Sequence, residues 1–595
     1  DALIDSVLAA HPDVVMTVAA ANDGPGFSTV GFPASADRVI AVGATLPPAA
    51  FGGAADDSTA DVVAPFSSRG GEIAAPDIVA PGTAYSTVPN FATGQELEFG
   101  TSMASPYAAG LSARLVSALA ASKRAPSGDL IRQALRMGAR SLPSGGILDQ
   151  GAGLPDLGAA WAWLAEPHEL QSITVEAGGI TGRGAVYLTS NASGMGARVV
   201  LHETGSGSGV LRLHADSGWL HVPETVVMAN GRGEFVASAV PTPLAASGAI
   251  SSAIRIEGPD ETAGPLAVVP VTIRTPVTDQ GTRTPIVVQQ APGTTRRIFV
   301  HADTGRGVQI EVATLRASDQ VSASLHEPGG MPYRDGSGIV AGYGDGAGLF
   351  DIGGNDVVSG LYEVDVTAGP RAPISARVSV HPSPVRLGGV LLHDTLRVTA
   401  RSLVTIPLSV RLRAGLLGAE RQLIVHASGD APVRLVVPVP NWAAHVAVDT
   451  RMPREAWSRF TDLGLSFLDR RGREFATTPI NYAFSRATPE LPDSIAGDSL
   501  VLLLSPGFAD PADRAPWTLD VNVRFYVATP YSLDAGGSPY KPVVAGGLRE
   551  ECFVTAALPI AVPPEFVPVI TVVALEGTDH TWTREVVIAR PGSPP

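Results

Sequence analysis

The sequence predicts a multidomain protein in which an α/β domain is followed by all-β domains. Up to about residue 164, short apolar strands alternate with helices, which is typical of a mainly parallel sheet with helices on both faces. From about residue 165 the hydrophobic period falls from about 3.6 residues to about 2, and Gly, Ser and Asn separate short strands. The chain of 595 residues is long enough for several such domains.

Apolar segments in the first part predict strands at residues 14–20, 38–44 and 75–82. Helices are expected around these strands. They are an amphipathic helix at the beginning of the chain, an Ala-, Ser- and Gly-rich helix from about Ser102 to Ser122, a helix capped by Ser127, and a short helix that carries Trp161 and Trp163.

The β-rich remainder is expected to form three parts. Residues 165–283 hold about seven short strands, the size of an immunoglobulin- or fibronectin-like sandwich. In this part Asn230 and Gly231 predict a tight hairpin. A second β-domain is expected at residues 284–382, and one or more further β-rich domains at residues 383–595.

Composition excludes several classes of protein. The net charge of −15 gives no basic surface for nucleic acid, and no apolar run reaches the roughly 18 residues of a membrane span. The single cysteine, Cys552, excludes intrachain disulfides and cysteine-based metal clusters. We expect this thiol to be buried.

One serine lies in an unusual run of small residues, "GTSMASP" at residues 100–106, where a helix is expected to begin. A nucleophilic serine needs an exposed hydroxyl, a backbone amide aimed at the developing oxyanion, and a base beside it. A helix N-terminus offers free amides and the positive end of the helix dipole, and Gly100 permits close approach of a substrate. We therefore take Ser102 as a candidate nucleophile rather than an ordinary helix cap.

The run around Ser102 resembles the nucleophile motif of the subtilisin-like serine proteases, or subtilases. Upstream segments agree with this family in order, at residues 18–25, 28–44, 66–70 and 75–82. Within the family the sequence most resembles the tripeptidyl peptidase II-like group, and this resemblance weakens in the β-rich region and fades after about residue 380. It implies an incomplete α/β subtilisin-like domain at residues 1–164, followed by β-sandwich or jelly-roll domains.

The resemblance places the oxyanion-hole asparagine at Asn22. A carboxamide at the C-terminal end of a parallel strand is able to donate an N–H to a tetrahedral intermediate, and an ordinary Asn-Asp-Gly turn is the alternative interpretation of this segment. Ala19, Ala20 and Ala21 would line one side of the S1 pocket, with Gly100 as a further substrate-binding residue. The family usually has glycine where this chain has Ala21. The alanine is strained if its φ is positive, and otherwise adds a methyl group to the pocket wall.

The aspartate and histidine motifs of this family precede the asparagine, and no such residues precede Asn22. His11 is the one histidine before Ser102 and lacks the Gly-Thr-His setting. The sequence therefore indicates the C-terminal part of a peptidase domain, with the base and its aspartate in a missing N-terminal segment. Residues 1–595 alone are expected to be inactive.

We expect a serine-type peptidase, either an endopeptidase or a tripeptidyl aminopeptidase, that hydrolyses peptide bonds through Ser102 and Asn22. The alternative is a catalytically inactive protease-like scaffold whose β-domains bind a protein or carbohydrate partner. The presence of both residues favours the enzyme, because a scaffold needs neither.

No metal or other cofactor is required for this chemistry. The Gly- and Asp-rich segment 342–360 leaves a structural calcium ion open, but β-roll calcium sites need several stacked repeats. The expected partners are a peptide or protein substrate and the missing part of the peptidase domain, and an oligomer is left open. The multi-β organisation favours secretion or the cell envelope over the cytoplasm.

Overall fold

The computed structural model of the chain divides into two compact units. One comprises Asp1–His301, Ile310–Phe350 and Gly360–Val380, and the other comprises Ala302–Gln309, Asp351–Ser359 and His381–Pro595. The structure describes residues 2–47, 61–86, 96–168, 172–190, 195–203, 208–239, 248–277, 284–303, 307–316, 319, 321–333, 339–341, 347–352, 358–369, 372–392, 395–404, 408–457, 459–480, 484–508, 510, 512–533, 541–543, 547–554, 558–576 and 580–587.

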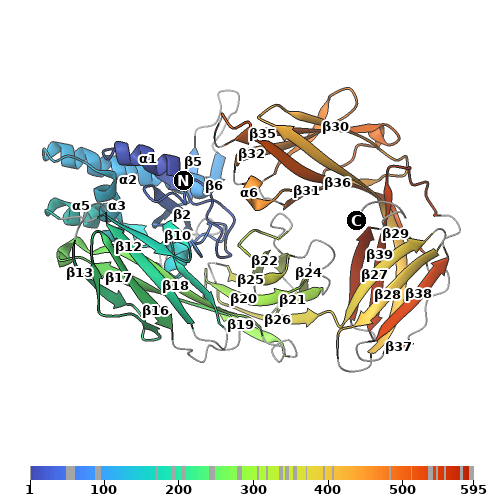
Figure 1. Cartoon of the computed structure of the whole chain (residues 1–595), viewed down its shortest axis with the longest axis horizontal. Helices are drawn as coiled ribbons and strands as arrows, with labels where there is room; N and C mark the ends of the chain where they lie inside the picture. The colour runs from blue at the N-terminus through green and yellow to red at the C-terminus, as the bar shows by residue number, and fades with distance from the viewer. Residues whose placement is uncertain are drawn as a thin grey trace. The chain divides into compact units, whose positions relative to one another are not determined.

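The first part of the chain is built on a small, mainly parallel sheet (Figure 1). Strand β2 (Ile40–Leu46) lies between β1 (Thr17–Ala19) and β4 (Ile78–Pro81), pairs with both in parallel, and pairs with β3 (Val62–Val63) antiparallel. The other elements of this part are α1 (Ala2–Ala10), β5 (Thr83–Ser86), β6 (Glu96–Phe99), α2 (Thr101–Ala121), α3 (Gly128–Met137), β7 (Ala139–Arg140), α4 (Ile147–Gln150), β8 (Leu154–Pro155) and α5 (Leu157–Ala165).

Alternate residues of β2 pack against opposite sides of the sheet, as the period of a strand requires. Ile40 and Val42 belong to a core cluster with residues of α2, α3 and α5. Ala41 belongs to a second cluster with Leu8 of α1. Helices therefore lie on both faces of the sheet, and the carboxyl ends of β1, β2 and β4 lie at one edge.

Helix α3 begins after Ser127, the cap residue that the sequence predicts. Ser127 has an extended backbone, and its hydroxyl accepts a hydrogen bond from the Leu130 N–H at 3.1 Å. This bond satisfies one of the free amides in the first turn of the helix. Helix α2 begins differently, because its N-cap position is Gly100, which has no side chain to cap the helix.

Residues 173–275 form a sandwich of two five-stranded sheets, ordered β10-β9-β12-β16-β14 and β11-β18-β17-β13-β15. Side chains from both sheets meet in one core, including Val199 and Leu201 from the first and Ile254 and Val269 from the second. The strands are β9 (Ile173–Ala177), β10 (Ile180–Gly182), β11 (Val186–Thr189), β12 (Met195–Glu203), β13 (Gly209–Ala215), β14 (Leu220–His221), β15 (Thr225–Met228), β16 (Arg232–Ala239), β17 (Gly248–Glu257) and β18 (Pro265–Thr275).

The expected hairpin at Asn230 and Gly231 is present between β15 and β16. Both residues have positive φ, 53° and 73°, which is the combination that a two-residue type I′ turn requires. Burial alternates along the whole of β16 that follows this turn.

A second pair of four-stranded sheets follows, ordered β19-β26-β21-β24 and β20-β25-β22-β23. The strands are β19 (Ile286–Gln290), β20 (Thr295–Ala302), β21 (Val308–Thr314), β22 (Val321–His326), β23 (Ile339–Ala341), β24 (Ala347–Ile352), β25 (Gly360–Ala368) and β26 (Ile374–Pro382). The expected domain boundaries near residues 165 and 283 stay predictions, because they adjoin residues outside the described part. Much of the Gly- and Asp-rich segment 342–360 also lies outside the described residues.

The remaining chain forms three sheets, ordered β27-β28-β38, β34-β31-β36-β29-β39-β40 with β37 beside β29, and β30-β35-β32-β33. Strand β29 (Leu408–Ser428) is 21 residues long, and its two halves belong to different core clusters. The other elements are β27 (Val385–Leu392), β28 (Thr395–Ser402), β30 (Val433–Pro438), β31 (His445–Arg451), α6 (Arg454–Trp457), β32 (Phe460–Leu468), β33 (Glu474–Pro479), β34 (Phe484–Ala487), β35 (Ser499–Phe508), β36 (Pro516–Ser532), β37 (Lys541–Val543), β38 (Leu548–Val554), β39 (Val567–Glu576) and β40 (His580–Val587).

The expectation of a buried thiol was wrong, because Cys552 is exposed. The cysteine lies in β38, which pairs with β28 at one edge of a three-stranded sheet. An apolar sequence does not reveal which strand forms an edge, and an edge strand has less cover from its neighbours. No helix among the described residues is long and apolar enough to cross a membrane.

Candidate active site

Ser102 occupies the first turn of α2 and is exposed to solvent. The hydroxyl of Ser102 makes no hydrogen bond to any residue that the structure describes. The preceding Gly100 has a φ of 154°, a conformation that residues with a Cβ rarely adopt. Its N–H donates to the carbonyl of Gly82, which follows β4, at 2.9 Å. The serine is thereby held at the carboxyl edge of the parallel sheet, where ligands of α/β folds commonly bind.

Asn22 lies at the same edge, three residues after the end of β1. Its Oδ1 accepts two hydrogen bonds from Thr101, one from the backbone N–H at 2.9 Å and one from the hydroxyl at 3.0 Å. Asn22 therefore caps the first amide of α2. Two donors on Oδ1 also fix the orientation of the carboxamide, because an amide bound this way must turn its NH2 group in the other direction.

The Asn22 amide and the Ser102 backbone converge on the space that Gly100 leaves open. A Cβ placed on Gly100 would lie 3.5 Å from the Ser102 backbone nitrogen and 3.6 Å from Asn22 Nδ2. Among described residues, Nδ2 has no hydrogen-bond acceptor. This space is thus bordered by two N–H groups, one from a side chain and one from a helix N-terminus, and also by Asn22 Oδ1 at 3.7 Å. Such a pair is suited to bind an oxyanion.

The sequence of this part of the chain matches a known protein family. The model of the family described as "Subtilase family" matches residues 3–154. Residues 3–154 form a subtilase domain. This match covers the strands, the asparagine and the serine described above, and the β-rich parts lie outside it.

Two curated relatives are similar to parts of this chain. Pyrolysin of Pyrococcus furiosus is 36% identical over 178 residues, which cover 25% of this chain and 13% of pyrolysin. Tripeptidyl-peptidase 2 of Arabidopsis thaliana is 29% identical over 299 residues, which cover 44% of this chain and 21% of that protein. The chain therefore spans only a small part of the length of either relative.

The similarity in fold extends further than the similarity in sequence. A crystal structure of tripeptidyl peptidase 2 matches with a TM-score of 0.62 at 15% identity, over 99% of this chain and 54% of that one. At this identity the match concerns the fold alone. It nevertheless reaches the β-rich region after about residue 380, where the resemblance in sequence fades.

The three alanines before Asn22 differ in their surroundings. Ala20 is fully buried, and its N–H donates to the Val42 carbonyl at 3.0 Å, whereas Ala19 and Ala21 are partly exposed. Ala21 has a φ of 84°. This left-handed conformation decides between the two readings of the sequence: the alanine is strained at a position where subtilases usually have glycine.

We expect Ala21→Gly to stabilise the subtilase domain by about 1 kcal/mol, since strain at a non-glycine residue with positive φ costs about 1–3 kcal/mol and the added flexibility of the unfolded chain offsets part of the gain. Local unfolding measured by hydrogen exchange of the amides in β1 and β2 reports this change. Ala20→Gly is the matched control. It removes a buried methyl group at a residue without positive φ, so it should accelerate exchange. Equal destabilisation by both substitutions would contradict the strain.

No described histidine forms a hydrogen bond with the Ser102 hydroxyl. His11 lies in the turn after α1, where its N–H donates to the Val7 carbonyl at 3.0 Å. His326 lies against the segment that follows Asn22, but its side chain is only 2% exposed. Its Nε2 lies 2.9 Å from the Asp23 carbonyl and its Nδ1 lies 2.8 Å from Asp365 Oδ2. With both nitrogens engaged in the interior, His326 cannot accept a proton from an exposed serine.

The sequence reasoning missed the groups that hold the segment after Asn22, which we call the Asn22 loop (residues 22–27). The Ser68 hydroxyl accepts a hydrogen bond from the Asp23 N–H at 3.1 Å, and the Ser68 N–H donates to the Ala21 carbonyl at 3.0 Å. Ser68 belongs to the segment 66–70 that resembles the subtilases. That resemblance could have identified Ser68 as a residue near the site, although it does not show which backbone groups the serine binds.

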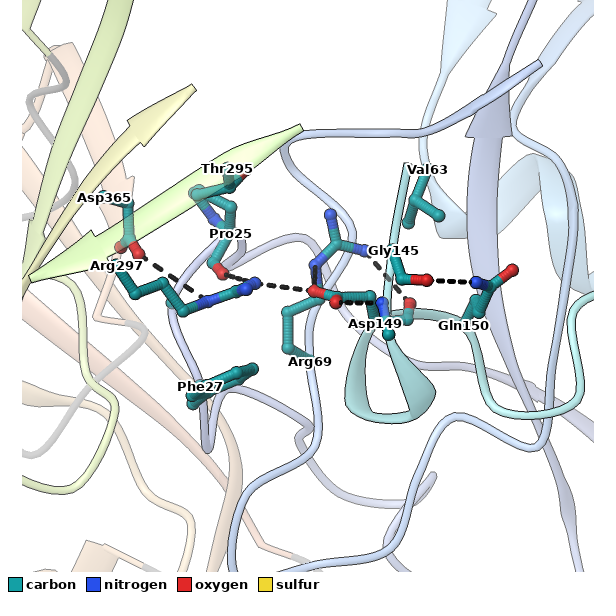
Figure 2. A network of polar contacts seen from close by, with 12 residues as sticks. Pro25, Phe27, Val63, Arg69, Gly145, Asp149, Gln150, Thr295, Arg297 and Asp365 are labelled. Carbon is teal, nitrogen blue, oxygen red and sulfur yellow. Dashed lines mark hydrogen bonds and ion pairs between the residues drawn. The ribbon is translucent and has the colours of Figure 1, made fainter. Parts of the chain in front are cut away.

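A buried row of alternating charges continues from this segment into the second pair of four-stranded sheets, which we call the second β unit (Figure 2). Arg69 Nε lies 3.2 Å from Asp149 Oδ1, and Arg297 Nη2 donates to the same oxygen at 2.6 Å. Burial opposes the charge on Asp149, but Arg297 and Arg69 outweigh it, so its pKa lies below the usual value. Burial lowers the pKa of Arg69 to about 10, so its charge persists at neutral pH. Asp149 therefore joins two arginines that are far apart in the sequence.

Proposed function

We propose that this subtilase domain belongs to a serine peptidase, with Ser102 as the nucleophile and Asn22 as the oxyanion-hole side chain. The observation that carries this proposal is the double hydrogen bond from Thr101 to Asn22 Oδ1, which leaves Nδ2 as a donor beside the space that the Ser102 amide also borders. An inactive scaffold would use the Oδ1 cap of α2, but it would have no use for an N–H donor beside an exposed serine hydroxyl.

In the proposed reaction the Ser102 oxygen attacks the carbonyl carbon of a peptide bond while a base removes its proton. The carbonyl oxygen becomes an oxyanion, and Asn22 Nδ2 and the Ser102 N–H donate to it. The base then protonates the leaving amine, and an acyl ester remains on Ser102. Water hydrolyses this ester by the same steps, which releases the second product and restores the serine.

We assign the base and its aspartate to a polypeptide segment that precedes residue 1. Two observations support this assignment. No histidine among the described residues forms a hydrogen bond with the Ser102 hydroxyl. Large apolar side chains are also exposed around the site, on α1, on β6 and on α2, namely Leu3, Val7, Phe99 and Tyr107. A packed segment of chain would cover such surface.

The size of the substrate stays open within this proposal. Ala19 and Ala21 are partly exposed beside Asn22 and could contact a substrate side chain, and Gly100 leaves room for its carbonyl group. The relatives include both pyrolysin and a tripeptidyl-peptidase. Both an endopeptidase and a tripeptidyl aminopeptidase are therefore compatible with the domain.

The test is labelling by a fluorophosphonate, which reacts with a serine only when a base activates it. We expect the full-length protein to be labelled at Ser102, as located by mass spectrometry of the modified peptide. Residues 1–595 alone should stay unlabelled, because they lack the proposed base. Strong labelling of Ser102 in residues 1–595 would show that a base lies within them and would overturn the assignment to a preceding segment.

The same experiment also tests the scaffold alternative. A scaffold whose β-domains bind a protein or carbohydrate would leave Ser102 unlabelled in the full-length protein as well. Labelling at another serine would refute the assignment of Ser102 itself.

A further inference from the structure

Three side chains from one β-sheet reach three backbone groups of the Asn22 loop. His326 Nε2 lies 2.9 Å from the Asp23 carbonyl oxygen. Arg297 Nη2 donates to the Pro25 carbonyl at 2.8 Å. The Phe27 N–H donates to both carboxylate oxygens of Glu363, at 3.2 and 3.1 Å. The three side chains lie on β22, β20 and β25, which are neighbours in the sheet order β20-β25-β22-β23.

The pairing of these strands explains how the side chains are brought together. In the register of β22 and β25, His326 lies directly opposite Glu363. Asp365 is two residues further along β25, so it projects from the same face as Glu363. Arg297 Nε lies 3.2 Å from Glu363, and its guanidinium stacks over the ring of Phe27 at 3.9 Å, as Figure 2 shows in part.

Both ring nitrogens of His326 face oxygen atoms. Nδ1 faces the Asp365 carboxylate and Nε2 faces the Asp23 carbonyl, and both of these groups only accept hydrogen bonds. Burial opposes the charge, but Asp365, Glu363 and the Asp23 carbonyl outweigh it, so the pKa of His326 lies above its usual value. Burial and Asp365 raise the pKa of Glu363 to about 8, and Arg297 on β20 opposes that shift.

The Asn22 loop fits against this sheet without spare room. A Cβ on Gly26 would lie 2.5 Å from the ring of His326. On its other side the loop is bonded to Ser68, and the Gly24 N–H donates to the Phe66 carbonyl at 2.9 Å. The loop is thus held between residues 66–68 and the second β unit, and Asn22 is the residue from which it starts.

We propose that His326, Arg297 and Glu363 form a clamp by which the second β unit positions the oxyanion donor Asn22. The clamp touches no reacting atom, so its members are positioning residues, and their effect on turnover rests on the proposed role of Asn22. The β unit would then be a working part of the active site rather than an appended binding domain.

The experiment compares two variants of the full-length protein. Asp365→Asn removes the buried carboxylate but leaves a neutral His326 whose Nε2–H still donates to Asp23. His326→Leu combined with Asp365→Asn also removes this donor, without leaving an unpaired buried carboxylate at residue 365. Because both proteins carry Asp365→Asn, their difference reports the contact between His326 and the loop.

We expect hydrogen exchange of the amides in residues 22–27 to be about tenfold faster in the double variant than in Asp365→Asn, as loss of one buried hydrogen bond implies. This measurement needs no catalytic activity. Asp319→Asn serves as a control within the same β unit, since Asp319 is also a buried aspartate and accepts a hydrogen bond from the Ser375 N–H. Unchanged exchange in the Asn22 loop would overturn the clamp.

The kinetic readout separates positioning from general damage. The double variant should lose about tenfold or more in kcat with KM within about twofold, because the donor acts mainly in the transition state. In a protein that already carries Asn22→Asp, the same change should lower kcat no further. A full further loss would show that His326 acts elsewhere. If Asn22→Asp alone leaves kcat normal, the proposed role of Asn22 fails, while the exchange result still decides the clamp.

Discussion

Replacing Ser102 with alanine is expected to lower kcat of the full-length protein by on the order of 10⁶, the effect of removing the nucleophile from a serine-protease triad. The stability of the domain should not change. Ser102 is exposed, and its hydroxyl makes no hydrogen bond to described residues, so the substitution removes only the attacking oxygen. Hydrolysis of a chromogenic peptide measures the activity, and thermal unfolding measures the stability.

Ser117→Ala is the matched control for this experiment. Ser117 is also an exposed serine of α2, four turns further along the same helix. This variant should keep full activity. If Ser102→Ala retained more than about one hundredth of the activity, the nucleophile would have to be another residue, since no triad member can be lost at so small a cost.

The second large effect concerns Asn22, where two substitutions separate two roles. Asn22→Ala removes the oxyanion donor and also the acceptor that caps α2, so we expect kcat to fall by about 10²–10³ and stability to fall by about 1 kcal/mol. Asn22→Asp keeps an acceptor oxygen for Thr101 and places a negative charge at a helix N-terminus, which favours the fold. It should therefore lose at least as much activity while keeping its stability.

The measurements are kcat and KM of each full-length variant, together with its denaturation midpoint. KM should stay nearly unchanged in Asn22→Ala, because the donor is used mainly in the transition state. A tenfold rise in KM with a normal kcat would assign Asn22 to substrate binding instead. Equal loss of stability in both variants would refute the capping role of Oδ1.

Local elements could be predicted from the sequence because local residues determine them. Ser127 caps α3 through a residue three positions away, and Asn230 with Gly231 supplies the two positive φ values of its own hairpin. The serine at the start of α2 also followed from a contiguous motif. Each of these features depends on chemistry within a few residues of chain.

Features that depend on distant pairing were not predictable in this way. Glu363 binds the Phe27 N–H across 336 residues of sequence, and neither segment carries a pattern that names the other. Cys552 was misjudged for a related reason, because its exposure depends on where β38 lies in a sheet. The strain at Ala21 could be posed as a question from the sequence, but only the backbone geometry answered it.

Strand β29 links two hydrophobic cores in the C-terminal part of the chain. Residues Leu408–Leu416 contribute to one core and Ala419–Val425 to another, and a register shift between Leu416 and Gly418 marks the change. Strand β36 passes through both cores beside it. Neither core can be removed or exchanged without the other, because they share continuous strands. A cut through these strands would break hydrogen-bonded strand pairs in both cores. Any engineering of this part of the chain therefore has to treat both cores as a single module.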